Sequence, residues 1–307
     1  MLSLRELGSA MRAQNKDNPV GSKSTVQRVW KEQGYRRVRV RSLPLLTQGH
    51  KKARLEWATV YAAAIEPFGD DSTIYMNIDE KWFYAVRIGQ MQWRGRHEKL
   101  HPIHLIHRSH VVKEMFLAAV ARPIATRRFA GNIGIWPVTA TKTAKHSSKN
   151  HKKGDEYLAS TSMDASKFKD MLCTLVLPAA LKAGRGWAKK IIVQMDNAVG
   201  HGGGSGNINN TTIPALNAWI SDNKSLLVSA WGNDDLPQIN FITQPARSPD
   251  CNVLDLGAWN SLQTTFEKLQ IEHLGESVPI ETLRQRVQES WSKWSASEKL
   301  NSLLIHF

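Results

Sequence analysis

The sequence predicts an α/β domain with a mixed β-sheet, preceded by a small helical arm. Candidate strands come first along the chain and candidate helices come later, with one strand–helix alternation in the middle. This order is typical of an α/β class with a mixed sheet flanked by helices. With 307 residues, 41% of them hydrophobic, the chain is long enough to bury a sizeable core in one large domain.

The chain is strongly basic, and the charge is concentrated near its N-terminus. The formal net charge is +14 and the pI is near 9.8, which favours a polyanionic partner, most often nucleic acid. Residues 1–55 hold 13 Lys or Arg and only 3 Asp or Glu, so most of the excess lies in the first sixth of the chain. The alternative is a basic tail that only keeps the protein soluble.

Composition and pattern argue against several other classes. Cys173 and Cys251 are the only cysteines and form no C-x-x-C pair, which argues against a disulfide framework or a structural zinc site and fits a reducing compartment. No run approaches the roughly 18 apolar residues of a membrane span, and no secretory signal is present, so we expect no membrane partner. Pro102 argues against a regular helix that would gather four regularly spaced histidines into a metal site. These are His101, His104, His107 and His110.

Two short helices are predicted in the arm. Ser3–Glu6 and Ser24–Gln27 both place a hydroxyl three residues before Glu or Gln, the capping-box pattern, and the helices should end near Met11 and Gly34. A basic second helix indicates a helix-turn-helix unit whose second helix enters the major groove of DNA. The alternative is an ordinary helical hairpin, since the loop is longer than usual. The predicted buried stripe is Val26, Val29 and Trp30, and the predicted DNA-facing residues are Lys23, Thr25, Arg28 and Lys31.

A basic extended strip follows the second helix. Apolar and basic residues alternate over residues 35–42, and such a strip can lie along phosphates or in a minor groove. The strip also has the character of a nuclear import signal, so we expect a nuclear location. The alternative is a solvated run of charge. Its basic residues are Arg36, Arg37, Arg39 and Arg41.

The next segment is predicted to connect the arm to the main domain. Thr47 should cap a helix over residues 48–65, with an apolar side formed by Leu55, Ala58, Ala62 and Ile65. The predicted organisation is therefore an arm over residues 1–42, a linker helix over 43–65, and a catalytic domain over 66–307.

The main domain contains the candidate strands and most of the helices. Strands are predicted over residues 73–78, 83–88 with 90–93, 111–120, 134–138, 190–195 and 240–244. Helices are predicted over 165–181, 213–221, 254–269 and 279–294, with a last one capped by Ser297. Asp164 should cap the first of these, and Pro178 should bend its end. The inward stripe of the third is predicted as Leu256, Trp259, Leu262, Phe266 and Leu269.

Two loops have distinctive compositions. Residues 142–154 are basic, polar and rich in turn formers, which predicts a surface loop facing nucleic acid. Residues 200–206 are rich in glycine and should be flexible. They do not form a phosphate-binding loop, because no Lys followed by Ser or Thr stands at the required spacing.

Three carboxylates stand where α/β folds build sites. Asp79 and Asp196 follow apolar strands, and Asp255 opens an amphipathic helix. Carboxylates are hard ligands suited to Mg²⁺ or Mn²⁺, and a pair of such ions can activate a hydroxyl and stabilise the leaving oxygen of a phosphodiester. Without metal, clustered carboxylates would raise one another's pKa. The alternative for each aspartate alone is a turn or cap residue.

Two neighbouring acidic residues are not assigned as ligands. Strand alternation points Glu80 to the face opposite Asp79. Asp250 competes with Asp255 for the third position, but its Ser-Pro-Asp context predicts loop capping.

Three blocks of the sequence resemble the mariner superfamily of DDE/D transposases, in the branch whose third acidic residue is aspartate. The blocks are IDEKWFY at 78–84, MDNAVGH at 195–201 and QPARSPDCNVLDLG at 244–257. Further similarity lies in MFLAAVARP, GNIGIWPV, KSTVQRVWKEQG and LTQGHKKARLEWA, so the resemblance covers most of residues 22–270.

The resemblance implies an RNase H-like core, two divalent ions (Mg²⁺ or Mn²⁺), hydrolytic nicking at transposon ends and strand transfer into target DNA. By this resemblance Asp79, Asp196 and Asp255 match the catalytic, metal-binding carboxylates. Asn197 and His201 accompany the second aspartate, as residues that support it or face the substrate. The implied partners are double-stranded DNA and a second copy of the chain, as a homodimer on paired ends.

The sequence also departs from the family pattern. Only one of the usual two helix-turn-helix units is recognisable, and 58 residues separate Asp196 from Asp255, more than the family's few dozen. The excess falls in residues 200–240, which we interpret as an insertion. The alternative function is therefore a catalytically inactive or domesticated, transposase-derived DNA-binding protein. A structural α/β protein with incidental charge would place the three aspartates far apart.

Overall fold

The computed structural model describes residues 28–29, 31–34, 45–64, 71–86, 111–148, 151–198, 201–202, 208–232, 235–271 and 278–296. The chain divides into two compact units, Met1–Leu45 and Leu46–Phe307, and each is treated by itself. Within the described residues, no helix is long and apolar enough to span a membrane.

In the first unit, the second predicted helix is present. Residues 28–29 and 31–32 are helical and the helix ends at Gly34, whose φ of 82° is the left-handed conformation that glycine adopts at helix ends. The prediction that Val29 lies on a buried stripe is wrong, because its exposed fraction is 38%. The helix predicted to end near Met11 and the basic strip lie outside the described residues, as do Val26 and Trp30.

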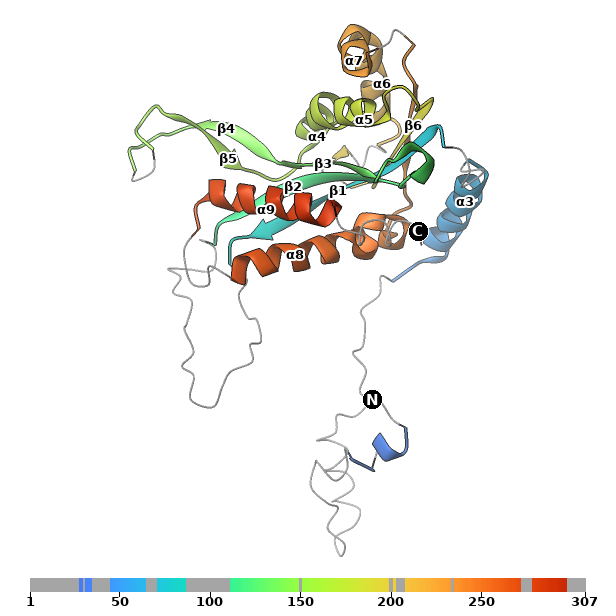
Figure 1. Cartoon of the computed structure of the whole chain (residues 1–307), viewed down its shortest axis with the longest axis horizontal. Helices are drawn as coiled ribbons and strands as arrows, with labels where there is room; N and C mark the ends of the chain where they lie inside the picture. The colour runs from blue at the N-terminus through green and yellow to red at the C-terminus, as the bar shows by residue number, and fades with distance from the viewer. Residues whose placement is uncertain are drawn as a thin grey trace, which may run out of the picture. The chain divides into compact units, whose positions relative to one another are not determined.

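The second unit is built on a five-stranded mixed sheet in the order β3-β2-β1-β6-β7 (Figure 1). Strands β1, β2 and β3 are antiparallel neighbours, while β6 and β7 run parallel to β1. The mixed sheet with helices on both faces confirms the predicted α/β class and is RNase H-like. The strands are β1 (Thr73–Tyr84), β2 (Lys113–Ala121), β3 (Asn132–Pro137), β6 (Lys190–Met195) and β7 (Gln238–Thr243).

Strand β1 is longer than the sequence predicted. We expected a break after Ile78, at the polar residues 79–81, but β1 continues to Tyr84. The reason is its antiparallel neighbour, since β1 pairs with β2 from Met76 to Tyr84 and the ladder carries the strand past the polar residues. The separate strand predicted over 83–88 is therefore wrong in its first two residues, and residues 87–100 lie outside the described part.

Helices cover both faces of the sheet (Figure 1). Along β2 the side chains alternate between two cores. Leu117, Ala119 and Ala121 join the core beneath α4 (Ala165–Met171), η3 (Leu172–Val176), α5 (Leu177–Gly184), α6 (Thr212–Asp222) and α7 (Lys224–Trp231). Phe116, Ala118 and Val120 join the core beneath η6 (Leu254–Ala258), α8 (Trp259–Ile271) and α9 (Ile280–Ser295).

The helix after Asp164 begins as predicted and then widens. Asp164 accepts a hydrogen bond from the Lys167 backbone N–H at 3.0 Å, which is the predicted cap. The turn at η3 is a π turn just before Pro178. Proline has no N–H for the carbonyl four residues back, so the helix relaxes there instead of ending, and it continues to Gly184.

A second π turn, η6, precedes α8 and changes the predicted stripe. Trp259, Leu262 and Phe266 are buried as predicted, but Leu256 is 51% exposed, so its assignment to the inward face was wrong. The wide turn breaks the 3.6-residue spacing that the prediction assumed between Leu256 and Trp259.

The linker helix is present as α3 (Gln48–Ala64). Thr47 caps it as predicted, since its hydroxyl oxygen accepts a hydrogen bond from the His50 backbone N–H at 3.2 Å. Two residues of the predicted apolar side are not buried, since Leu55 is 70% exposed and Ala58 is also exposed, while the Ala62 side chain and Ile65 lie outside the described part. Arg54 of this helix pairs with Asp250 of the loop before η6.

The remaining elements are short. The predicted basic loop over 142–154 is partly a hairpin, because Lys142 and Thr143 belong to β4 (Thr139–Thr143), which pairs with β5 (Glu156–Ser160). Two 3₁₀ turns occur at η2 (Ala125–Arg127) and η5 (Pro249–Cys251). Residues 200–240, predicted as an insertion, contain α6, α7 and the start of β7.

Candidate active site

The sheet register brings Asp79 and Asp196 to the same edge of the sheet. The parallel pairing of β1 with β6 ends at Asn77 and Gln194, and Asp196 directly follows β6. The sequence indicated that Asp79 lies at or near the end of its strand. In the structure it lies within β1, in the part that extends beyond this parallel pairing. Ligand sites in α/β sheets lie at such carboxyl ends of parallel strands.

Asp255 lies in η6 and reaches the same edge from the opposite end of the sequence. Burial, followed by the charge of Asp196, raises the pKa of Asp255, while a hydrogen bond with the Asp79 carboxyl group lowers it in part. Burial, followed by the charge of Asp255, raises the pKa of Asp79 to about 8. The three predicted carboxylates therefore influence one another, and the reading in which they lie far apart is excluded.

Asp196 is neutralised by a buried histidine. His201 is 2% exposed, its Nδ1 lies 2.5 Å from Asp196 Oδ1, and its Nε2 lies 2.7 Å from Glu80 Oε1. Burial lowers the pKa of His201, but hydrogen bonds to Asp196 and Glu80 outweigh it and raise the pKa to about 10. Burial raises the pKa of Asp196, yet the same His201 contact leaves it below its usual range. Around Asp196, a histidine cation thus faces two carboxylates.

His201 is held in place at its ring and at its backbone. It stacks on Phe168 with ring centroids 3.8 Å apart, and the Thr212 hydroxyl donates to its backbone carbonyl at 2.6 Å. His201 therefore supports Asp196 from within the protein. Asn197 does not contact the carboxylates in this arrangement, and its side-chain oxygen accepts a hydrogen bond from the Ile208 backbone N–H at 3.4 Å.

Glu80 belongs to the site, although sequence reasoning gave it no role there. Strand alternation does turn it to the face opposite Asp79, since Glu80 meets His201 while Asp79 meets Trp259. Because His201 bridges to Asp196, Glu80 still acts on the cluster through the histidine. No signal in the sequence connects Glu80 with His201, since 121 residues separate them.

Two further residues fix the carboxylates, and sequence reasoning missed both. The Trp259 indole N–H donates to Asp79 Oδ2 at 2.7 Å. Asn252, which is 1% exposed, donates to the Ile78 carbonyl at 3.1 Å and accepts from the Leu254 backbone N–H at 3.0 Å. Asn252 thereby ties the start of η6 to the backbone next to Asp79. Trp259 could have been found, because it stands one helical turn after Asp255.

Asp250 is not a member of the cluster. Its carboxylate pairs with the Arg54 guanidinium of α3, with one contact at 2.8 Å and a second, shorter one. The hydrogen bond from Arg54 holds the pKa of Asp250 below its usual range. The Asp250 carboxylate also hydrogen-bonds with its own backbone N–H, and its pair with Arg54 additionally connects this loop to α3.

The donor set suits a hard divalent cation, although no preformed cage exists. Among the described residues, no three His, Cys, Asp or Glu side chains are arranged to hold a metal ion. The charge of Lys81 lowers the pKa of Asp255, yet the pKa values of Asp79 and Asp255 both stay raised, and carboxylate oxygens are the ligands that Mg²⁺ and Mn²⁺ prefer. A divalent cation would supply the missing positive charge there.

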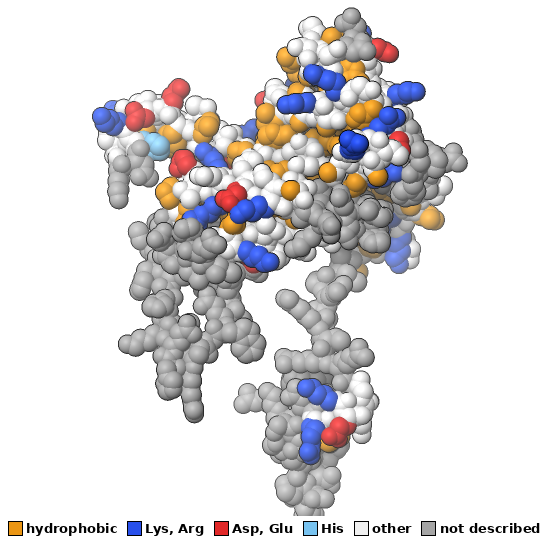
Figure 2. Space-filling view, viewed as in Figure 1, with side chains coloured by type: hydrophobic (Ala, Val, Ile, Leu, Met, Phe, Trp, Pro, Cys, Tyr) orange, Lys and Arg blue, Asp and Glu red, His pale blue; other side chains and the backbone are white. Residues whose placement is uncertain are grey.

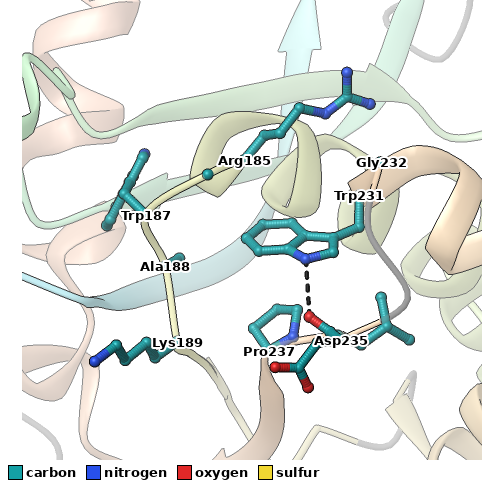
Figure 3. A pocket seen from close by; sticks show the side chains of 10 residues that line it. Arg185, Trp187, Ala188, Lys189, Trp231, Gly232, Asp235 and Pro237 are labelled. Carbon is teal, nitrogen blue, oxygen red and sulfur yellow. Dashed lines mark hydrogen bonds between the residues drawn. The ribbon is translucent and has the colours of Figure 1, made fainter.

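A cavity elsewhere in the unit does not contain this site. It has a volume of about 620 Å³ and lies where β6 and β7 begin, whereas Asp196 follows the end of β6 (Figure 3). Within it the Trp231 indole N–H donates to the Asp235 carbonyl at 3.0 Å. None of the three carboxylates lines this cavity, whose walls include Arg185, Trp187, Lys189, Trp231 and Pro237.

The predicted DNA-facing residues of the arm are only partly described. Arg28 and Lys31 are exposed, and Arg28 lies 3.9 Å from Glu32 in a solvent-exposed pair. Lys23, Thr25, Arg36, Arg37, Arg39 and Arg41 lie outside the described residues.

Known proteins match this chain in two ways, by sequence over the N-terminal residues and by structure over most of the chain. Residues 1–63 match a Tc3-type helix-turn-helix family model described as "Transposase". The structure is similar to the Mos1 mariner paired-end complex with Mn, with a TM-score of 0.55 at 14% identity, covering 99% of this chain and 73% of that chain. It is also similar to the Mos1 transposase paired-end complex with the left transposon end, with a TM-score of 0.54 at 14% identity and coverages of 97% and 74%. No curated protein matches the sequence significantly.

Proposed function

The chain resembles the mariner superfamily of transposases in its N-terminal sequence and in its fold, and from this premise we propose that it is a metal-dependent DNA transposase. In this proposal it cleaves phosphodiester bonds at transposon terminal repeats and joins the ends to target DNA. The observation that carries the proposal is the contact between Asp79 and Asp255 beside Asp196, at one edge of the sheet.

Asp79, Asp196 and Asp255 would hold two Mg²⁺ or Mn²⁺ ions. Such ions, when bound, activate a water or a 3′-hydroxyl and stabilise the leaving oxygen. The chain itself orients the ligands. Trp259 fixes one oxygen of Asp79, and His201 with Glu80 keeps Asp196 ionised and turned toward the edge of β6. Two similar Mos1 mariner paired-end complexes are described as complexes with Mn and with Mg, which supports the choice of metal.

The proposed partner is double-stranded DNA, comprising the transposon ends and the target. The net charge of +14 and the helix-turn-helix match over residues 1–63 support this partner. The similar structures are named as paired-end complexes, which supports a homodimer that holds two ends. The basic strip of the arm supports a nuclear location.

The test is cleavage of DNA by the purified full chain. We expect nicking of supercoiled plasmid in the presence of Mn²⁺ or Mg²⁺, and none with EDTA. Asp79→Asn and Asp196→Asn should each abolish nicking, because each removes a charged metal ligand while conserving shape. The matched control is Asp170→Asn, an exposed aspartate on α4, which should nick as the parent does. Equal nicking by Asp79→Asn would reject the assignment.

A second candidate is a DNA-binding protein that has lost catalysis. The observation that favours it is the lack of a preformed three-ligand group among the described residues, with Asp196 already paired to His201. This candidate predicts that DNA binding survives Asp79→Asn unchanged and that calorimetry detects no heat of Mn²⁺ binding. Measurable Mn²⁺ binding that Asp79→Asn removes would decide for the enzyme.

A further inference from the structure

The hairpin formed by β4 and β5 is separate from the five-stranded sheet. It is a two-stranded sheet of its own and extends from the body beyond β3 (Figure 1). At its base, the Arg284 guanidinium donates to the Leu158 carbonyl at 3.2 Å, and the Thr161 backbone N–H donates to the Val138 carbonyl at 3.3 Å. It contains none of the three carboxylates, and nothing in the proposed chemistry uses it.

The described part of the hairpin tip is ordered by its own hydrogen bonds. The Ala144 N–H donates to the Asp155 carbonyl at 2.8 Å, and the Gly154 N–H donates back to the Ala144 carbonyl at 2.9 Å. The Asp155 carboxylate accepts the Lys152 N–H at 2.7 Å, and the Ser147 hydroxyl oxygen accepts the Lys153 N–H at 3.0 Å. The side chains of the tip are therefore presented on a defined frame.

This frame presents unpaired positive charge. Four lysines of the hairpin are exposed, and within the described part of the chain none of them forms an ion pair. The Asp155 carboxylate is occupied by the loop backbone. Figure 2 shows lysine or arginine side chains and a histidine on this hairpin, at the left of the view, together with acidic groups. The four lysines are Lys142, Lys145, Lys152 and Lys153.

The pairing of β4 with β5 places Lys142 and Glu156 on opposite faces of the hairpin. Lys142 lies opposite Tyr157, and Thr143 lies opposite Glu156. Because side chains alternate along a strand, Lys142 and Tyr157 share one face and Glu156 is on the other. His151 stacks on Tyr157 with ring centroids 4.1 Å apart. One face thus combines a cation with a stacked aromatic pair and has no carboxylate among its strand residues.

We propose that this hairpin is a second DNA-binding arm, which contacts the phosphates of duplex DNA without reading sequence. The lysine ammonium is a point charge suited to phosphate, and residues 139–160 contain no arginine for bidentate reading of bases. The charged face fits a polyanion, whereas a protein partner would cover the opposite face, where Leu158 is 53% exposed. The inference rests on the proposed function only in taking duplex DNA as the partner.

The test is the salt dependence of binding by the full chain to a mixed-sequence duplex, measured by fluorescence anisotropy in EDTA, so that no cleavage occurs. The variant replaces Lys142, Lys145, Lys152 and Lys153, the four lysines named above, with glutamine. Each lysine that pairs with a phosphate contributes about 0.9 to the slope of log K against log salt. The slope should therefore fall by up to about 3.6 with all four contacts, and the affinity should weaken at every salt concentration.

A matched control removes the same number of charges elsewhere. It carries Lys182→Gln, Lys189→Gln, Lys224→Gln and Lys293→Gln, all exposed positions outside the hairpin. The control should lower the slope by less than one contact. Equal losses in the two variants would show a general effect of net charge and overturn the proposal. Circular dichroism and thermal melting establish that both variants are folded.

The remaining outcomes also decide the matter. If the hairpin variant keeps the parent's slope but changes the oligomeric state in sedimentation, the hairpin is a protein contact and the proposal is wrong. If the proposed enzymatic function is wrong, a different result shows it, namely the absence of Mn²⁺-dependent nicking. The slope of the hairpin variant is measured without metal and is independent of nicking.

Discussion

The carboxylate cluster has two halves, Asp196 with Glu80 and Asp79 with Asp255. They differ in how their negative charge is balanced. Asp196 and Glu80 are bridged by His201, and the pKa of Asp196 lies below its usual range. Asp79 and Asp255 contact each other, and the pKa of both lies above the usual range. One half is thus a completed ion-pair network within the protein. In the other half the charge of Lys81 acts on Asp255, but the pKa values of Asp79 and Asp255 both stay raised, which suits a bound cation.

The largest expected effect on stability comes from removing His201, which balances the charge of Asp196 and Glu80. His201→Ala leaves Asp196 and Glu80 at a largely buried position without their cation, which should lower the free energy of unfolding by about 3–5 kcal/mol. Urea unfolding measures the change. The matched control is His146→Ala, an exposed histidine, which should cost less than about 0.5 kcal/mol. A loss below about 1 kcal/mol for His201→Ala would mean that the bridge is not a folded-state interaction in solution.

In the second half, the raised pKa of Asp79 should make the affinity for Mn²⁺ depend on pH. Because the pKa of Asp79 is raised to about 8, a proton occupies this carboxyl at neutral pH and must leave before a cation binds. Mn²⁺ should therefore bind about 100-fold more weakly at pH 6 than above pH 8, as calorimetry would measure. An affinity independent of pH across this window would contradict the raised pKa.

The raised pKa of Asp79 also predicts that replacing its carboxyl group stabilises the fold at high pH. A carboxyl whose pKa rises from 3.8 when unfolded to about 8 when folded contributes stability below the lower value and loses it as pH rises through that window. At pH 8 without metal, Asp79→Asn should therefore raise the free energy of unfolding by about 1–2 kcal/mol. Thermal melting at pH 5 and pH 8 tests this, and the gain should shrink at pH 5.

The smallest effect should come from the indole that fixes Asp79. Trp259→Phe removes the hydrogen bond to Asp79 Oδ2 and keeps most of the packing. Because this bond lowers the pKa of Asp79, its loss should raise that pKa further and weaken Mn²⁺ binding at pH 7 about three- to tenfold, or about 1 kcal/mol. The control Trp291→Phe, on α9, should leave Mn²⁺ affinity unchanged.

Local patterns in the sequence determined most elements and several caps. β6 was predicted at its observed bounds, and the caps at Thr47 and Asp164 were predicted from single residues. These features succeed because strand alternation and capping depend on residues within a few positions of each other. The three aspartates were likewise found from short motifs.

Only the tertiary structure decided which groups meet. Pairing with β2 carried β1 past Asp79, and packing brought Glu80 against His201 and Arg54 against Asp250, across 121 and 196 residues. Packing also left Leu55 and Leu256 exposed where periodicity predicted burial. A periodic pattern shows which face of an element is apolar, but the partner of a polar side chain depends on strand register and helix packing, which are set by contacts distant in sequence.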